Sequence, residues 1–95
     1  MLRQGDLLFV PCDGIPSDAK VVADNVVARG ETTGHTHRVR AGAVVLMAGM
    51  VQYIRALQEA FVDHEEHATV ILPTGDWLVK RQREYQSDGW RQVAD

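Results

Sequence analysis

The sequence contains a single cysteine, Cys12, among its 95 residues. One cysteine excludes a disulfide within the chain and a zinc site built from several thiolates. Such sparing use of cysteine is typical of proteins kept in a reducing compartment. We therefore expect a cytoplasmic protein.

Long apolar runs are also missing. The longest, from Ala43 to Val51, is interrupted by Gly49 and falls well short of the roughly 20 residues that span a bilayer. The first residues, MLRQGD, lack the apolar segment of about 7–15 residues that a secretory signal requires. We therefore expect neither a membrane segment nor export.

Positive charge is not in excess, because 10 Lys and Arg stand against 13 Asp and Glu and give a net charge of -3. A surface that neutralises phosphates needs clustered cations without offsetting acids. Nucleic acid is therefore a poor candidate partner. Trp77, Arg81 and Arg83, which share one face of a predicted strand, keep base stacking as a minor alternative.

The rest of the composition is that of an ordinary globular domain. Hydrophobic residues make up 45% of the chain and charged residues 24%, which argues against a disordered or fibrous protein. A chain of this length buries about 60–65% of its unfolded surface and can form a modest core. We expect one domain over residues 1–95.

Short apolar segments between turn residues predict an all-β fold for the first half of the chain. Residues 7–10 (LLFV) form an uninterrupted apolar run that ends at Pro11, as a strand covered on both faces would. A loop is expected over 13–18. The valine pairs 21–22 and 26–27 flank Asp24 and Asn25 and predict a hairpin around an Asx turn.

The second half continues the pattern. Residues 43–58 are ambiguous: a tight turn at Ala48 and Gly49 between β-branched segments favours a hairpin, whereas apolar residues three and four apart allow one short helix. Further strands are expected over 68–72 and 77–85, with turns at 73–76 and 87–89 and a tail from 90 to 95. Short antiparallel strands at this spacing predict a small barrel or sandwich.

All four histidines occur in two pairs: His35 with His37 in the segment 30–37 (GETTGHTH), and His64 with His67 in HEEH. Residues two apart on a strand point to the same side, and residues three apart share one face of a helical turn. Each pair could therefore bring two imidazoles to one ion. Zinc, iron, nickel, copper and manganese all accept such ligands.

Glu65 and Glu66 lie between the second pair of histidines. Either carboxylate could complete a metal site or act as a general base. The alternative stays open that the first pair is two surface residues and that HEEH is a solvated turn.

Two resemblances bear on this pattern. Gly30, the first histidine pair and Pro73-x-Gly75 resemble part of the cupin motifs, which implies a small barrel that holds a divalent metal. The cupin glutamate is absent after His37, as is the histidine after the Pro-x-Gly turn. The phrases GExTGHxH, HEEH, LPxG and QREY resemble a group of small uncharacterised bacterial and phage proteins, which implies a compact unit without a known reaction.

Two functions remain as expectations. In the first, the paired histidines hold a divalent metal ion, and Glu65 or Glu66 moves a proton during hydrolysis or isomerisation of a small polar molecule. In the second, the chain is a non-enzymatic accessory module of phage or bacterial origin with structural histidines. Such a module would bind a protein partner or a second copy of itself through an exposed strand edge.

Overall fold

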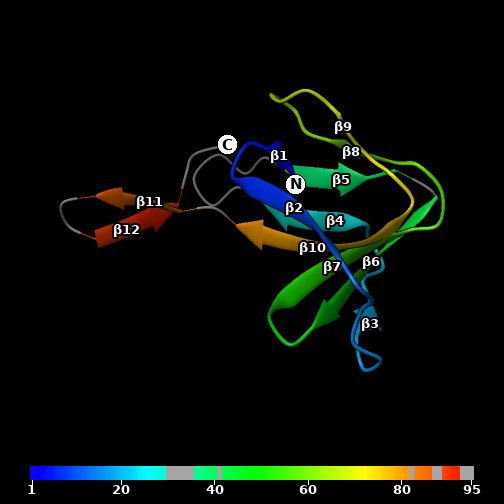
Figure 1. Cartoon of the computed structure of the whole chain (residues 1–95). Coiled ribbons are helices and arrows are strands. Elements are labelled where there is room, and N and C mark those ends of the chain that lie inside the picture. Colours follow the sequence, from blue (N-terminus) through cyan, green and yellow to red (C-terminus); the bar gives the residue numbers. More distant parts are fainter. Residues whose placement is uncertain (30–35, 41, 82, 87–88, 93–95) are drawn as a thin grey trace.

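The computed structural model describes residues 1–29, 36–40, 42–81, 83–86 and 89–92, and within them every regular element is an antiparallel β-strand (Figure 1). The larger sheet has six strands in the order β1 (Leu2–Gln4), β2 (Leu7–Cys12), β10 (Gly75–Arg81), β7 (Val51–Ala56), β6 (Ala43–Ala48) and β3 (Lys20–Val21). The smaller sheet has four, in the order β4 (Val26–Arg29), β5 (Thr36–Val39), β8 (Ala60–Asp63) and β9 (Val70–Leu72). Strands β11 (Arg83–Gln86) and β12 (Gly89–Gln92) form a separate ribbon. The all-β prediction is confirmed, and the described part of the chain has no helix that could cross a membrane.

One hydrophobic core lies between the two larger sheets. Its members are the buried, alternating residues of each strand: Leu7, Phe9, Ala43, Val45, Ile54, Ala56, Trp77 and Val79 from the larger sheet, and Val27, Val39, Ala60, Val62 and Leu72 from the smaller one. The larger sheet ends at β1 and β3, and the smaller sheet ends at β4 and β9. The sheets are therefore not closed into a barrel, so the barrel alternative and the closed cupin barrel do not describe this fold.

The hairpin favoured for residues 43–58 is present as β6 and β7. Ala48 pairs with Val51, so the two loop residues are Gly49 and Met50 rather than Ala48 and Gly49. Gly49 has φ of 60°, which a glycine adopts without steric cost at the first position of such a turn. The short-helix alternative is wrong, because pairing with β10 and β3 fixes these residues in a sheet.

The hairpin predicted around Asp24 and Asn25 is wrong. Strand β3 pairs with β6, whereas β4 pairs with β5. The Asx turn itself exists: Val26 N donates to Asp24 Oδ1 at 3.2 Å, and Asn25 has φ of 56°. Its effect is to carry the chain from one sheet to the other, because valines on both sides of it pack on the shared core.

The long strand predicted for 77–85 is two strands. Strand β10 ends at Arg81, where its pairing with β2 ends at Leu7, and β11 pairs only with β12. Beyond that point no strand among the described residues pairs with β10, and β11 and β12 form a ribbon of their own. Residues 90–92, expected in a tail, belong to β12, and two residues of the turn predicted at 87–89 lie outside the described residues.

The first hairpin, β1 with β2, was not predicted. Gln4 pairs with Leu7, which leaves Gly5 and Asp6 as a two-residue loop with Gly5 at φ of 58°. A Gly-Asp pair after alternating residues is a recognisable hairpin signal. Strand β1 lies beside β9 of the smaller sheet (Figure 1). The side chains of Gln4 and Asp6 in this hairpin therefore lie next to His37.

Candidate functional site

His37 lies on β5 with its side chain fully buried. The strand alternates between the interior and solvent, so His37 and Val39 point inward while Arg38 is exposed. A polar ring at 0% exposure needs hydrogen-bonding partners, since an unsatisfied buried polar group costs about 1–3 kcal/mol.

Those partners come from the first hairpin. Gln4 Oε1 lies 2.9 Å from His37 Nδ1, and Gln4 Nε2 donates to the carbonyl oxygens of Val62 at 2.8 Å and Ala68 at 2.9 Å. Because the amide nitrogen of Gln4 is the donor to two carbonyls, its oxygen can only accept. His37 Nδ1 therefore carries a hydrogen and donates to Gln4.

The other side of His37 faces a charge. Its Nε2 lies 3.4 Å from Asp6 Oδ1, and Asp6 Oδ2 lies 3.4 Å from a guanidinium nitrogen of Arg81. Asp6 is 0% exposed, and a buried carboxylate is tolerated where it is paired with cations. The two ring nitrogens of His37 thus face Gln4 on one side and Asp6 on the other.

His64 and His67 extend this arrangement into a row of three rings. The ring centroids of His37 and His64 lie 4.5 Å apart, as do those of His64 and His67. His64 Nδ1 accepts the backbone N–H groups of Glu66 at 3.0 Å and His67 at 3.3 Å. These bonds stabilise the turn, and they place the hydrogen of a neutral His64 on Nε2.

Glu65 is tied to the smaller sheet rather than directed at the histidine rings. Its carboxylate accepts the backbone N–H of Thr36 at 3.0 Å and the Thr36 hydroxyl at 3.2 Å. The backbone N–H groups of Glu65 itself and of Thr36 lower the pKa of this carboxyl, because they stabilise its charged form. Glu66 is exposed on the same turn.

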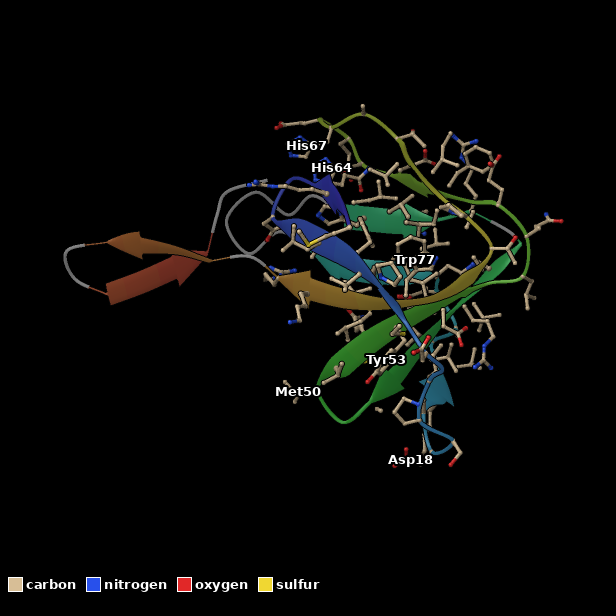
Figure 2. All side chains as sticks on the ribbon, in the orientation of Figure 1. Asp18, Met50, Tyr53, His64, His67 and Trp77 are labelled. Atoms are coloured by element: carbon tan, nitrogen blue, oxygen red, sulfur yellow. The ribbon has the colours of Figure 1, made fainter. Side chains whose placement is uncertain are left out.

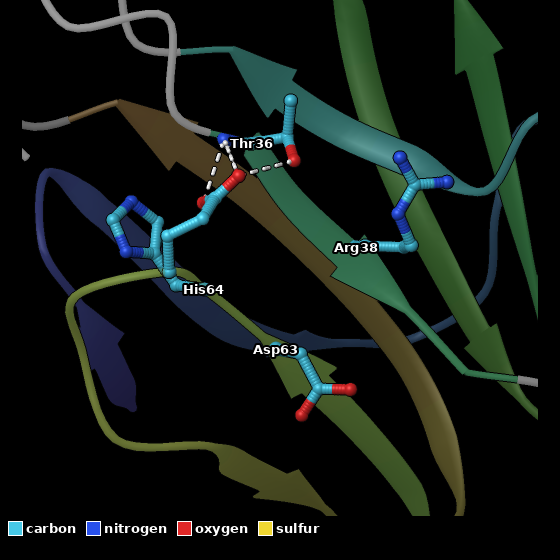
Figure 3. Close-up of a pocket in the computed structure, with 5 residues that line it drawn as sticks. Thr36, Arg38, Asp63 and His64 are labelled. Carbon is cyan, nitrogen blue, oxygen red and sulfur yellow. Dashed lines mark hydrogen bonds between the residues drawn. The ribbon is translucent and has the colours of Figure 1, made fainter.

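A hollow of about 260 Å³ opens beside this turn, lined by Thr36, Arg38, Asp63, His64 and Glu65 (Figure 3). Asp63 is held by Arg40 through bonds of 2.6 and 2.9 Å and by Thr69 at 2.7 Å. Hydrogen bonds from Arg40 and then Thr69 lower the pKa of Asp63. The side chain of Arg38 is exposed and makes no hydrogen bond or ion pair with any residue that the structure describes.

The structure thus brings together His37, His64 and His67, which are separated by up to thirty positions in the sequence. His35 lies outside the described residues. Across the described ranges, no cluster of three or more His, Cys, Asp or Glu side chains has the arrangement of a metal site. The predicted metal and proton-transfer roles stay predictions.

Three residues of the polar network around His37 were missed in the sequence: Gln4, Asp6 and Arg81. Gln4 and Asp6 adjoin a Gly-containing two-residue loop, so the hairpin signal was available, but nothing local marks either side chain as buried. Arg81 was noted only as an alternating cation on its strand.

Comparison with known proteins gave a family but no individual relative. Neither the curated proteins nor the solved structures include a significant match to this chain. One family model matches residues 3–82, which include both sheets and every described histidine. The chain belongs to the family described as a domain of unknown function, DUF8820.

Proposed function

We propose that this chain is a small, non-enzymatic interaction module in which the histidines are structural. The observation that carries the proposal is the bonding of His37, whose two ring nitrogens face Gln4 and Asp6 in the interior. A metal ligand must offer a nitrogen lone pair to the ion. Nδ1 of His37 donates to Gln4, and Nε2 faces a carboxylate.

The remaining predicted groups support the same proposal. The Nδ1 lone pair of His64 accepts two backbone N–H groups, and the Glu65 carboxylate accepts the N–H and hydroxyl of Thr36. A general base needs a lone pair within reach of a substrate proton. His64 instead stabilises the turn after β8, and Glu65 holds that turn against β5.

A binding role is supported by the hollow beside Arg38. The two carboxylates that line the hollow are bonded to neighbours, Glu65 to Thr36 and Asp63 to Arg40. The exposed guanidinium of Arg38 has no partner among the described residues. A guanidinium pairs well with a carboxylate or another planar anion. The hollow is therefore suited to an acidic side chain of a protein partner.

Metal analysis of protein purified without a histidine tag tests the proposal. We expect substoichiometric zinc, iron, nickel, copper and manganese, and a melting temperature that chelator changes by less than about 2 °C. One tightly bound ion per chain, with a large loss of thermal stability on chelation, would contradict the structural role.

A divalent metal site is the second candidate, and one observation favours it. His67 Nε2 is buried and has no hydrogen-bond partner among the described residues, and a bound ion is one explanation for such an atom. In that case His67→Ala would abolish the bound metal found in the same measurement, whereas Glu59→Ala, an exposed change outside the row of histidine rings, would retain it.

A further inference from the structure

The outer face of the larger sheet carries an apolar patch over three neighbouring strands. Leu78 on β10 lies opposite Val10 on β2 and Tyr53 on β7. Leu8 and Val51 lie on the same face one row further along, because side chains two apart on a strand share a face. We call these five residues the outer patch; Figure 2 labels Tyr53, and Met50 at the adjacent hairpin tip.

None of these five side chains belongs to the core between the sheets. Leu8, Val10, Tyr53 and Leu78 are half-buried, and Val51 is 40% exposed. A sheet with one solvated face normally alternates apolar and polar residues, whereas strands apolar on both sides are typical of sheets covered on both faces. The outer patch therefore has the composition of a covered surface.

Charged residues at the two ends of the patch indicate what covers it. On β10, Asp76 and Lys80 lie two residues before and two residues after Leu78, on the same face. Asp76 pairs with Arg55 at 3.0 Å, whereas the side chain of Lys80 is exposed and makes no hydrogen bond or ion pair among the described residues. The face thus has Asp76 with its partner Arg55 at one end, and Lys80 and Arg3 at the other.

We infer that the outer patch binds the same patch of a second copy of this chain. A two-fold axis along the row Val10, Leu78 and Tyr53 reverses the strand direction of the second copy. It places Lys80 of each copy opposite Asp76 of the other. A two-fold axis along the strands would place Lys80 against Lys80 instead, so charge selects the first arrangement.

The contact is face to face rather than edge to edge. Two sheets pack about 10 Å apart with their strands inclined by about 30°, and the apolar patch fills the space between them. The open edges are poorly suited to a partner, because β3 has two residues, β1 and β9 have three, and β4 is irregular between Val26 and Ala28. The inference rests on the proposed function and adds a second binding surface to the module, separate from the hollow beside Arg38.

Sedimentation equilibrium of the full chain tests this dimer, with Lys80→Glu as the disrupting variant. Wild type is expected to be a concentration-dependent dimer. Lys80→Glu is expected to raise its dissociation constant at least about tenfold, because the new glutamate of each copy would face Asp76 of the other copy. Lys80 is exposed, so the fold should persist, as circular dichroism would verify. The matched control, Lys20→Glu on β3, should leave the constant unchanged.

A compensating variant separates this geometry from other dimers. Arg55→Glu, Asp76→Arg and Lys80→Glu together reverse the charges that β7 and β10 contribute to the face, while Arg3 on β1 is unchanged. Both the pair within a copy and the pair between copies are then restored with opposite signs. The triple variant should dimerise within about threefold of wild type. A wild-type monomer, a Lys80→Glu dimer of unchanged strength, or a triple variant as weak as Lys80→Glu would each overturn the inference. The metal content bears only on the proposed function, so the two can fail separately.

Discussion

His37 and His67 differ in what their ring nitrogens contact. His37 contacts Gln4 and Asp6, which belong to the hairpin of the larger sheet. Among the described residues, His67 contacts His64 through its ring and donates its backbone N–H to His64 Nδ1. The contacts of His37 are hydrogen-bonding and ionic, and they are fully buried. The two residues therefore allow a comparison of a histidine inside a polar network with one outside it.

Replacing His37 by Ala should destabilise the protein by about 3–5 kcal/mol, because Asp6 and Gln4 would be left buried without this partner. His67→Ala, the matched control, should cost less than about 1.5 kcal/mol, since only ring packing is lost. Urea unfolding followed by circular dichroism measures both values.

Equal losses in the two variants would contradict the role given to the network. If His37→Ala does not fold, Asp6→Asn keeps the shape of the side chain and removes its charge. That variant should still lose more stability than His67→Ala.

At the scale of elements, the segment from Asp63 to Thr69 is attached to the smaller sheet by carboxylates. Glu65 binds Thr36 at the start of β5, and Asp63 binds Arg40 and Thr69. Both carboxyls have pKa values below their ordinary ones. The folded protein therefore holds these protons less tightly than the unfolded chain does.

This difference predicts acid sensitivity. A lowered carboxyl pKa contributes stability above the unfolded pKa of about 4, and the contribution is lost as pH falls through the folded pKa. Melting temperature should thus decline below about pH 5, and less steeply in Glu65→Gln and Asp63→Asn than in wild type. Thermal melts between pH 7 and 2.5 measure these slopes. A variant that declines as steeply as wild type would show that its carboxylate does not contribute.

The elements themselves were predictable where the signal was local. The β6–β7 hairpin follows from β-branched residues around Gly49, whose positive φ suits a two-residue turn. The turn at Asp24 and Asn25 was also predictable, but its pairing was not. Whether strands beside a turn pair with each other depends on which sheet has an open edge, and no local pattern records that.

At the scale of the whole molecule, the two larger sheets depend on each other. Neither has a complete core alone, since both contribute buried side chains to one cluster. Gln4 adds polar bonds from β1 to the carbonyl oxygens of Val62 and Ala68. The sheets should therefore unfold together.

We expect a single transition in which circular dichroism and Trp77 fluorescence have the same urea midpoint. Trp77 is 7% exposed in the shared core, and a Trp90→Phe background removes the other tryptophan. Separate midpoints, beyond experimental error, would show that one sheet survives without the other.

Sequence alone determined the all-β class, because short apolar segments between turn residues are a local property of the chain. The two histidine pairs also predicted a meeting of imidazoles, and the structure brings together His37, His64 and His67, whereas His35 lies outside the described residues. Only the tertiary structure decided what His37 does there. Gln4 and Asp6 reach that ring from β1 and from the first hairpin loop, and Arg81 at the end of β10 contacts Asp6. A buried histidine takes its role from whichever acceptors the fold places beside its nitrogens, and those acceptors lie far away in the sequence.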